Sequence, residues 1–302
     1  MLAQTFVMLA CILPLFFFLK KNRPVGLLII LLAANFLLTY NIAVTDLLVD
    51  TLLPLAGMCG LVFAVLYCGK EASKGTVLYA ACYSVFLINI KTSGIFFALL
   101  ICIWLLRWMK NNSPQMRVRV FSVCAPFASL IIWNRHCEYA FDGAQLSKFS
   151  ISFTNLSNVF SEKKADIISQ IVKSMFRFSV TWKDAWLTVL LFLLLGIWIL
   201  VCARDLLGCY KKISLFSAVL YIAYQIGLTQ MYLFSMPAEE AAVLSESIRY
   251  SKSIIIAVIY ILLILAMKTV SEMNTEKPGL LVLVSAAAAA SFFGFAFFQP
   301  EK

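Results

Sequence analysis

The chain consists of long apolar stretches that recur from one end to the other. About ten such stretches, each roughly 15–20 residues long, are separated by short charged or Gly- and Pro-containing segments. Roughly 20 apolar residues in a helix match the ~30 Å hydrocarbon core of a bilayer. Because lipid offers no hydrogen-bond partners to the backbone, such stretches must be helical. The sequence therefore predicts an all-α fold, a polytopic transmembrane helix bundle.

Composition excludes several other classes of protein. Hydrophobic residues make up 62% of the 302 residues, more than a water-soluble domain of this length could cover with polar surface. The net charge of +10 does not indicate nucleic-acid binding, because most Lys and Arg flank apolar stretches and no basic face alternates with aromatic residues. The nine cysteines form no Cys-x-x-Cys pair and lie mostly in or beside apolar stretches, so we expect small buried side chains rather than a redox or zinc site. With His136 as the single histidine, a His-based metal site is not expected.

We predict one integral-membrane domain, residues 1–302, and a topology that follows from its charges. The predicted spans are 1–19, 25–40, 51–68, 75–90, 94–106, 119–133, 184–203, 213–234, 252–267 and 279–298. Basic residues follow the first apolar stretch instead of preceding it, which favours a retained span with its N-terminus outside. The alternation then places most Lys and Arg of the short loops inside, but only four acidic residues: Glu71, Asp205, Glu272 and Glu276. The distribution of basic residues and that of acidic residues both predict a multi-pass protein of the cell (plasma) membrane with both termini outside.

Two longer outer segments are expected to carry additional helices. The loop 134–183 contains an amphipathic pattern over 161–178, which predicts a helix on the outer membrane surface or across the mouth of the bundle. In 235–251, Pro237 followed by Glu239 and Glu240 suits the first turn of a helix. A single helix there would place Glu239, Glu246 and Tyr250 on one face.

The polar residues most suited to a function lie at the predicted outer ends of the spans, because no Asp, Glu, Lys or Arg falls inside a predicted span. Asp46 and Asp50 could bind a metal, act as general base or hold a sugar hydroxyl; alternatively they cap the next helix. Lys91 could bind a lipid phosphate; alternatively, its long side chain simply extends towards the membrane–water interface. Arg249 and Tyr250 suit phosphate binding and stacking on a sugar, or an interfacial anchor paired with Glu246.

These residues together resemble the later part of bacterial integral-membrane glycosyltransferases of the GT-C superfamily, related to protein O-mannosyltransferases and aminoarabinose transferases. The resemblance rests on five elements: Tyr40…Asp46…Asp50, Lys91-Thr92-Ser93-Gly94, the polar stretch Lys148–Ser152, Glu239-Glu240 and Arg249-Tyr250. It implies transfer from a polyprenyl-phosphate-linked sugar at the outer face, with membrane lipids as partners. It also implies that Lys91, Lys148, Glu239, Arg249 and Tyr250 bind lipid phosphate or sugar, and it leaves open a divalent cation at the leaving phosphate.

The family's catalytic acid usually follows the first span in a large outer loop, whereas here Lys20-Lys21-Asn22-Arg23 follows that span. The resemblance therefore implies either a truncated, inactive fragment or the transfer of this role to Asp46 or Asp50. Two other classes stay open. A transporter or flippase of a lipid-linked or polysaccharide precursor predicts a water-filled passage at mid-membrane, and a non-catalytic membrane scaffold predicts neither passage nor outer cavity.

Overall fold

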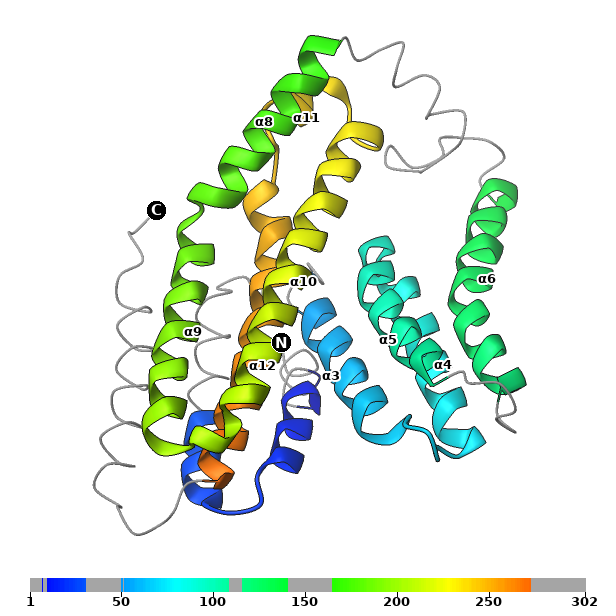
Figure 1. Ribbon diagram of the computed structural model, residues 1–302. Helices are drawn as coiled ribbons and strands as arrows, with labels where there is room; N and C mark the ends of the chain where they lie inside the picture. The colour runs from blue at the N-terminus through cyan, green and yellow to red at the C-terminus, as the bar shows by residue number, and fades with distance from the viewer. Residues whose placement is uncertain are drawn as a thin grey trace.

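The described part of the computed structural model consists of helices and the turns that connect them (Figure 1). It comprises residues 7, 10–30, 50, 52–108, 116–140 and 165–272. A helix over 23–30 accompanies the main elements, which are η1 (Leu13–Phe18), α3 (Leu52–Tyr67), α4 (Lys74–Ile90), η3 (Thr92–Gly94), α5 (Ile95–Arg107), α6 (Met116–Ala140), α8 (Ala165–Thr181), α9 (Lys183–Cys202), η4 (Arg204–Leu206), α10 (Leu207–Phe234), α11 (Ala238–Ala242) and α12 (Ser247–Glu272). The prediction of an all-α fold is confirmed for these residues.

Within the described part of the chain, four helical segments are long and apolar enough to cross a membrane: Met116–His136, Ile167–Cys202, Arg204–Phe234 and Ser247–Glu272. The helices α3, α4 and α5 are apolar but shorter, and they begin and end within one residue of three predicted spans. Residues 31–49 and 273–302 lie outside the described part of the chain, so the predicted number of ten spans is not tested.

Two turns of the chain contact the ends of neighbouring helices. The turn after η1 lies beside the C-terminal end of α12, where the Lys20 backbone N–H donates to Ser271 Oγ at 2.9 Å and the Asn22 amide donates to the Val270 carbonyl at 2.9 Å. Arg119, fully buried near the start of α6, donates to the carbonyls of Cys68 and Gly69 that follow α3. Three of these contacts, to the carbonyls of Val270, Cys68 and Gly69, satisfy groups that lie at or just after a helix end, where intrahelical partners are missing.

The helix α12 is the core of the bundle. In its most apolar 18-residue window 83% is buried, compared with 17% in each of the other three long segments. It packs against α3, α9, α10 and η1, and so joins a group formed by α3 to α6 with a group formed by α8 to α12 (Figure 1). Gly57 and Gly60 of α3 allow close packing, because a Cβ atom at either position would overlap Phe97 of α5 or Tyr83 of α4, respectively.

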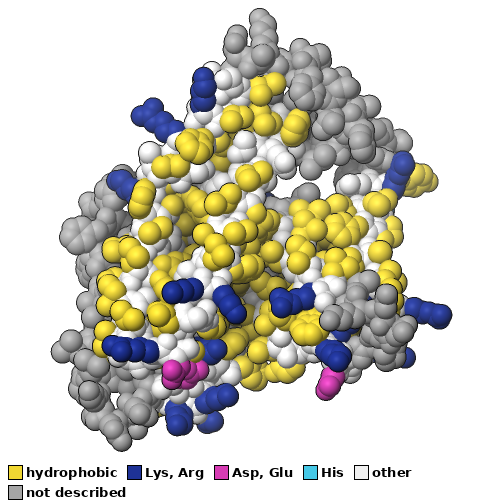
Figure 2. All heavy atoms as spheres, viewed as in Figure 1, with side chains coloured by type: hydrophobic (Ala, Val, Ile, Leu, Met, Phe, Trp, Pro, Cys, Tyr) yellow, Lys and Arg dark blue, Asp and Glu magenta, His cyan; other side chains and the backbone are white. Residues whose placement is uncertain are grey.

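Apolar side chains also cover much of the outside of the bundle. Leu193, Ile197 and Val201 of α9 are more than half exposed, and Figure 2 shows such side chains forming a broad band between regions that carry Lys and Arg. An apolar surface of this extent would be unfavourable in water but is suited to hydrocarbon. Together with the length and composition of the four long helical segments, this surface indicates a membrane protein.

Three expectations about the longer connections need correction or refinement. Helix α6 continues to Ala140, so residues 134–140 are helical instead of belonging to a loop. The amphipathic helix predicted over 161–178 occurs at 165–181 as α8, which packs against α10 and α11 and buries Ile171 and Met175. The prediction of a single helix within 235–251 is wrong, because the short α11 ends at Ala242 and a turn precedes α12.

Candidate functional site

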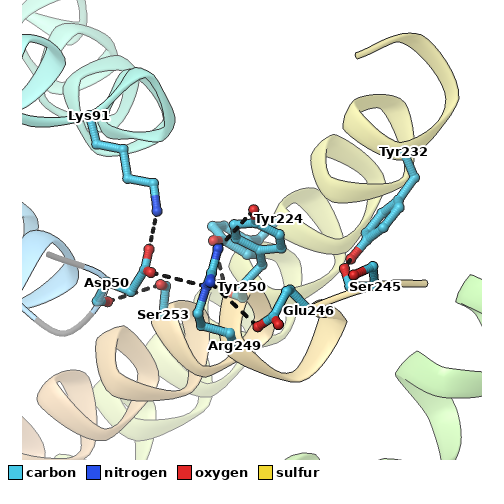
Figure 3. A network of polar contacts seen from close by, with 9 residues as sticks. All are labelled: Asp50, Lys91, Tyr224, Tyr232, Ser245, Glu246, Arg249, Tyr250 and Ser253. Atoms are coloured by element: carbon cyan, nitrogen blue, oxygen red, sulfur yellow. Dashed lines mark hydrogen bonds and ion pairs between the residues drawn. The ribbon is translucent and has the colours of Figure 1, made fainter. Parts of the chain in front are cut away.

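The carboxylate of Asp50 lies between two cations from distant parts of the chain (Figure 3). Asp50 comes just before α3, Lys91 follows the last residue of α4, and Arg249 lies in the first turn of α12. Asp50 Oδ1 binds Lys91 Nζ, and Asp50 Oδ2 lies 3.3 Å from Arg249 Nε. Because these three helix ends lie at the same end of the bundle, the fold gathers residues that the sequence keeps apart.

Tyr250 completes this arrangement. Its hydroxyl accepts a hydrogen bond from Arg249 Nη2 at 3.0 Å, and its ring lies 4.8 Å from Arg249 Cζ and 5.4 Å from Lys91 Nζ. Cations at such distances from an aromatic ring are attracted to its negative face. We refer to Asp50, Lys91, Arg249 and Tyr250 as the Asp50 cluster.

The cluster is buried at its carboxylate and open at its cations. The side chain of Asp50 is 11% exposed, whereas those of Lys91 and Arg249 are 29% and 33% exposed. Glu246 Oε2 lies 3.4 Å from Arg249 Nη1 and is 54% exposed at the rim. A ligand outside the protein can therefore reach Lys91 and Arg249, and the more buried carboxylate of Asp50 pairs with both cations on their inner side.

Helix dipoles affect the three charges differently. Asp50 lies at the N-terminal end of α3 and Lys91 at the C-terminal end of α4, which favours a negative and a positive charge, respectively. Arg249 lies at the N-terminal end of α12, where the dipole disfavours a cation. Its two carboxylate neighbours, Asp50 and Glu246, offset this effect.

Neighbouring hydroxyl groups fix the backbone around the cluster. Ser253 Oγ donates to the Asp50 carbonyl at 3.1 Å, and the Tyr224 hydroxyl donates to the Tyr250 carbonyl at 3.0 Å (Figure 3). The Tyr224 ring also makes an edge contact with Phe96 of α5, with ring centroids 5.0 Å apart. Sequence reasoning missed Ser253 and Tyr224. Ser253 lies one helical turn after Arg249, a spacing that could have indicated it.

The structure brings together four of the seven candidate residues. Asp50, Lys91, Arg249 and Tyr250 are in contact, and the alternative pairing of Arg249 with Glu246 is present as well. Asp46 and Lys148 lie outside the described residues.

Glu239 does not share a face with Tyr250. It is exposed on α11, and the turn between α11 and α12 separates the two residues. Leu244 and Glu246 adopt positive φ angles of 50° and 60°, which a continuous right-handed helix cannot contain.

The described residues offer a phosphate-binding arrangement more readily than a metal site. Among them, no group of three or more His, Cys, Asp or Glu side chains is arranged to hold a metal ion. By contrast, Lys91 and Arg249 offer N–H donors at a partly exposed rim, and phosphate oxygens accept such charge-assisted hydrogen bonds well.

Comparisons of the chain with protein-family models, with curated proteins and with solved structures gave no match.

Proposed function

We propose that the chain is a membrane glycosyltransferase-like protein of the GT-C type, which binds a polyprenyl-phosphate-linked sugar at the outer face of the cell membrane. The observation that carries this proposal is the convergence of Lys91, Arg249 and Tyr250 on the buried carboxylate of Asp50. Two partly exposed cations suit the phosphate, and the neighbouring aromatic ring suits the face of a sugar.

In this proposal Asp50 positions the two cations. Its carboxylate is mostly buried and already pairs with Lys91 and Arg249, so it is poorly placed to take a proton from an acceptor hydroxyl. Sugar transfer requires a base that removes the acceptor proton, attack on the anomeric carbon and departure of the phosphate. Lys91 and Arg249 stabilise the negative charge on the departing phosphate. Asp46 stays the candidate for the base.

The proposed orientation places the Asp50 cluster outside, with about ten spans and both termini outside. It is supported by the opposite end of the bundle, where Lys and Arg gather around the turns. The residues are Lys20, Lys21, Arg23, Lys70, Lys74, Arg107, Arg117, Arg204, Lys211, Lys212 and Lys268. Positive charge in short loops favours the inner side of a membrane.

The proposal is tested by binding of undecaprenyl phosphate to the purified protein in detergent, measured by native mass spectrometry. We expect Lys91→Ala and Arg249→Ala each to weaken binding by about tenfold or more, because each removes a charge-assisted contact worth roughly 1.5–3 kcal/mol. Lys173→Ala is the matched control, since Lys173 is an exposed cation of α8 at the same end of the bundle.

Equal binding by wild type and both cluster variants would contradict the proposal. A second assay distinguishes a transferase from a transporter. It measures the transfer of radiolabelled sugar from an undecaprenyl-phosphate-linked donor to an acceptor. Binding without sugar release, combined with movement of the lipid between the leaflets of a vesicle, would favour the flippase alternative.

A further inference from the structure

The guanidinium group of Arg249 has a protein partner at each of its three nitrogen atoms (Figure 3). Its Nε lies 3.3 Å from Asp50 Oδ2, its Nη1 lies 3.4 Å from Glu246 Oε2, and its Nη2 donates to the Tyr250 hydroxyl at 3.0 Å. A phosphate group bound to the same guanidinium would lie close to these carboxylates, and like charges at such a distance repel one another. Binding of a phosphate therefore favours the departure of one carboxylate.

Glu246 is the carboxylate that can leave. Its side chain is 54% exposed, whereas that of Asp50 is 11% exposed and also pairs with Lys91. An exposed ion pair contributes little to stability, because water solvates both charges well. The distance of 3.4 Å is also longer than that of a good N–H···O hydrogen bond. A ligand from outside the protein would displace Glu246 far more easily than Asp50.

The backbone that carries Glu246 is strained. Leu244 and Glu246 have φ angles of 50° and 60°, in the left-handed region that residues with a Cβ atom adopt only at a cost in free energy. The hydroxyl of Tyr232, a fully buried side chain of α10, donates to the Ser245 carbonyl between them and so holds the turn (Figure 3). The fold thus keeps an unfavourable backbone conformation in the turn that carries the carboxylate next to Arg249. Strain maintained in this way is typical of residues with a role at a ligand site.

The charges at the site balance only while Glu246 is in place. The two cations, Lys91 and Arg249, face the two carboxylates of Asp50 and Glu246. When Glu246 moves away, one positive charge is left in excess, and this excess favours an anion. The Glu246 carboxylate and a phosphate group are therefore alternative partners for the same cation.

We propose that Glu246 occupies the phosphate site of the unliganded protein as an internal competitor, and that a phosphate group displaces it from Arg249. The competitor lowers the affinity for every anion that contacts only the cations. A lipid-linked sugar has additional contacts, such as stacking on Tyr250, which offset the loss of the ion pair. Glu246 thereby makes the site selective against simple anions. This inference rests on the proposed function, because it concerns the same phosphate site.

The test uses the full chain in detergent and measures the dissociation constant of undecaprenyl phosphate by native mass spectrometry. We expect Glu246→Gln to lower this constant by about fivefold, which corresponds to the loss of a competing exposed ion pair of about 1 kcal/mol. Gln has the size of Glu without its charge, and the position is exposed, so the variant should fold like the wild type. Asp205→Asn removes the same charge at an exposed position of the opposite end, and should leave the constant unchanged.

A double variant separates direct competition from a general effect of charge. If Glu246 acts through Arg249, Glu246→Gln should give no gain in affinity in a chain that already carries Arg249→Ala. The inference is overturned if Glu246→Gln leaves the constant unchanged or raises it, if Asp205→Asn lowers it equally, or if the gain persists in the double variant. In each of these cases, wild-type binding that Lys91→Ala weakens still supports the proposed function. Absence of binding by both the wild type and Glu246→Gln would overturn the proposed function together with this inference.

Discussion

The carboxylate of Asp50 forms ion pairs with two cations from different helices, and the Ser253 hydroxyl donates a hydrogen bond to the Asp50 backbone carbonyl. Each side chain in this arrangement is explained by charge. A mostly buried carboxylate needs partners, and Lys91 and Arg249 supply them. The cations, in turn, would repel one another without Asp50. The stability of the three charged side chains in these positions therefore depends on all three, and substitution of one of them can measure this dependence.

We expect Asp50→Asn to destabilise the protein by about 3 kcal/mol, because it removes the mostly buried carboxylate that both cations share and leaves Lys91 and Arg249 as two neighbouring positive charges. The change should lower the thermal unfolding temperature of the protein in detergent, measured by fluorescence. Asp205→Asn is the control, since Asp205 is exposed at the opposite end of the bundle. An unchanged unfolding temperature in Asp50→Asn would mean that the ion pairs do not hold the helix ends together.

The sequence predicted that Asp50, Lys91 and Arg249 lie at one end of the bundle, but it did not predict how they pair, and the single helix expected to join Glu239 to Tyr250 is not formed. Asp50, Lys91 and Arg249 lie at the ends of apolar stretches whose alternation places them on the same side, and this is readable from length and charge. Their pairing depends on which helices are neighbours, and apolar stretches alone do not encode the neighbours. Tyr224 was missed for the same reason, since its role comes from its place beside Tyr250.

At the scale of helices, the apolar stretches predicted most boundaries closely. The hydrocarbon thickness limits how long an apolar helix must be, and α3 and α9 follow the predicted spans to within one residue. The turn before α12 was not predictable, because Leu244 and Glu246 are not residues that usually indicate a left-handed backbone. Helix α6 extends beyond its apolar stretch. The added residues are mostly polar, so they can be hydrated, and they are compatible with a helix.

The packing of α3 against α5 depends on the absence of a side chain at Gly57. We expect Gly57→Ala to destabilise the protein by about 2 kcal/mol, because the added methyl group would overlap the buried ring of Phe97. The measurement is again the thermal unfolding temperature in detergent. Gly227→Ala in α10 is the control, since a Cβ there meets no atom within 4 Å. Equal unfolding temperatures for both variants would show that α3 and α5 are not in close contact.

At the scale of the whole molecule, α12 joins the two helix groups through α3. The Asp50 cluster lies at this junction, because Arg249 belongs to α12, Asp50 precedes α3 and Lys91 follows α4. A ligand bound to the two cations would therefore contact both groups at once.

The most direct measurement for the central claim, that the Asp50 cluster faces the outer side of the membrane, is labelling of introduced cysteines on intact cells with a membrane-impermeant maleimide. Ser93→Cys and Ser245→Cys lie at the cluster's end of the bundle, and Glu71→Cys lies at the opposite end. The account predicts that the reagent labels positions 93 and 245 on intact cells, and position 71 only after the cells are opened. Labelling of position 71 on intact cells, with positions 93 and 245 protected, would place the cluster inside and contradict the account.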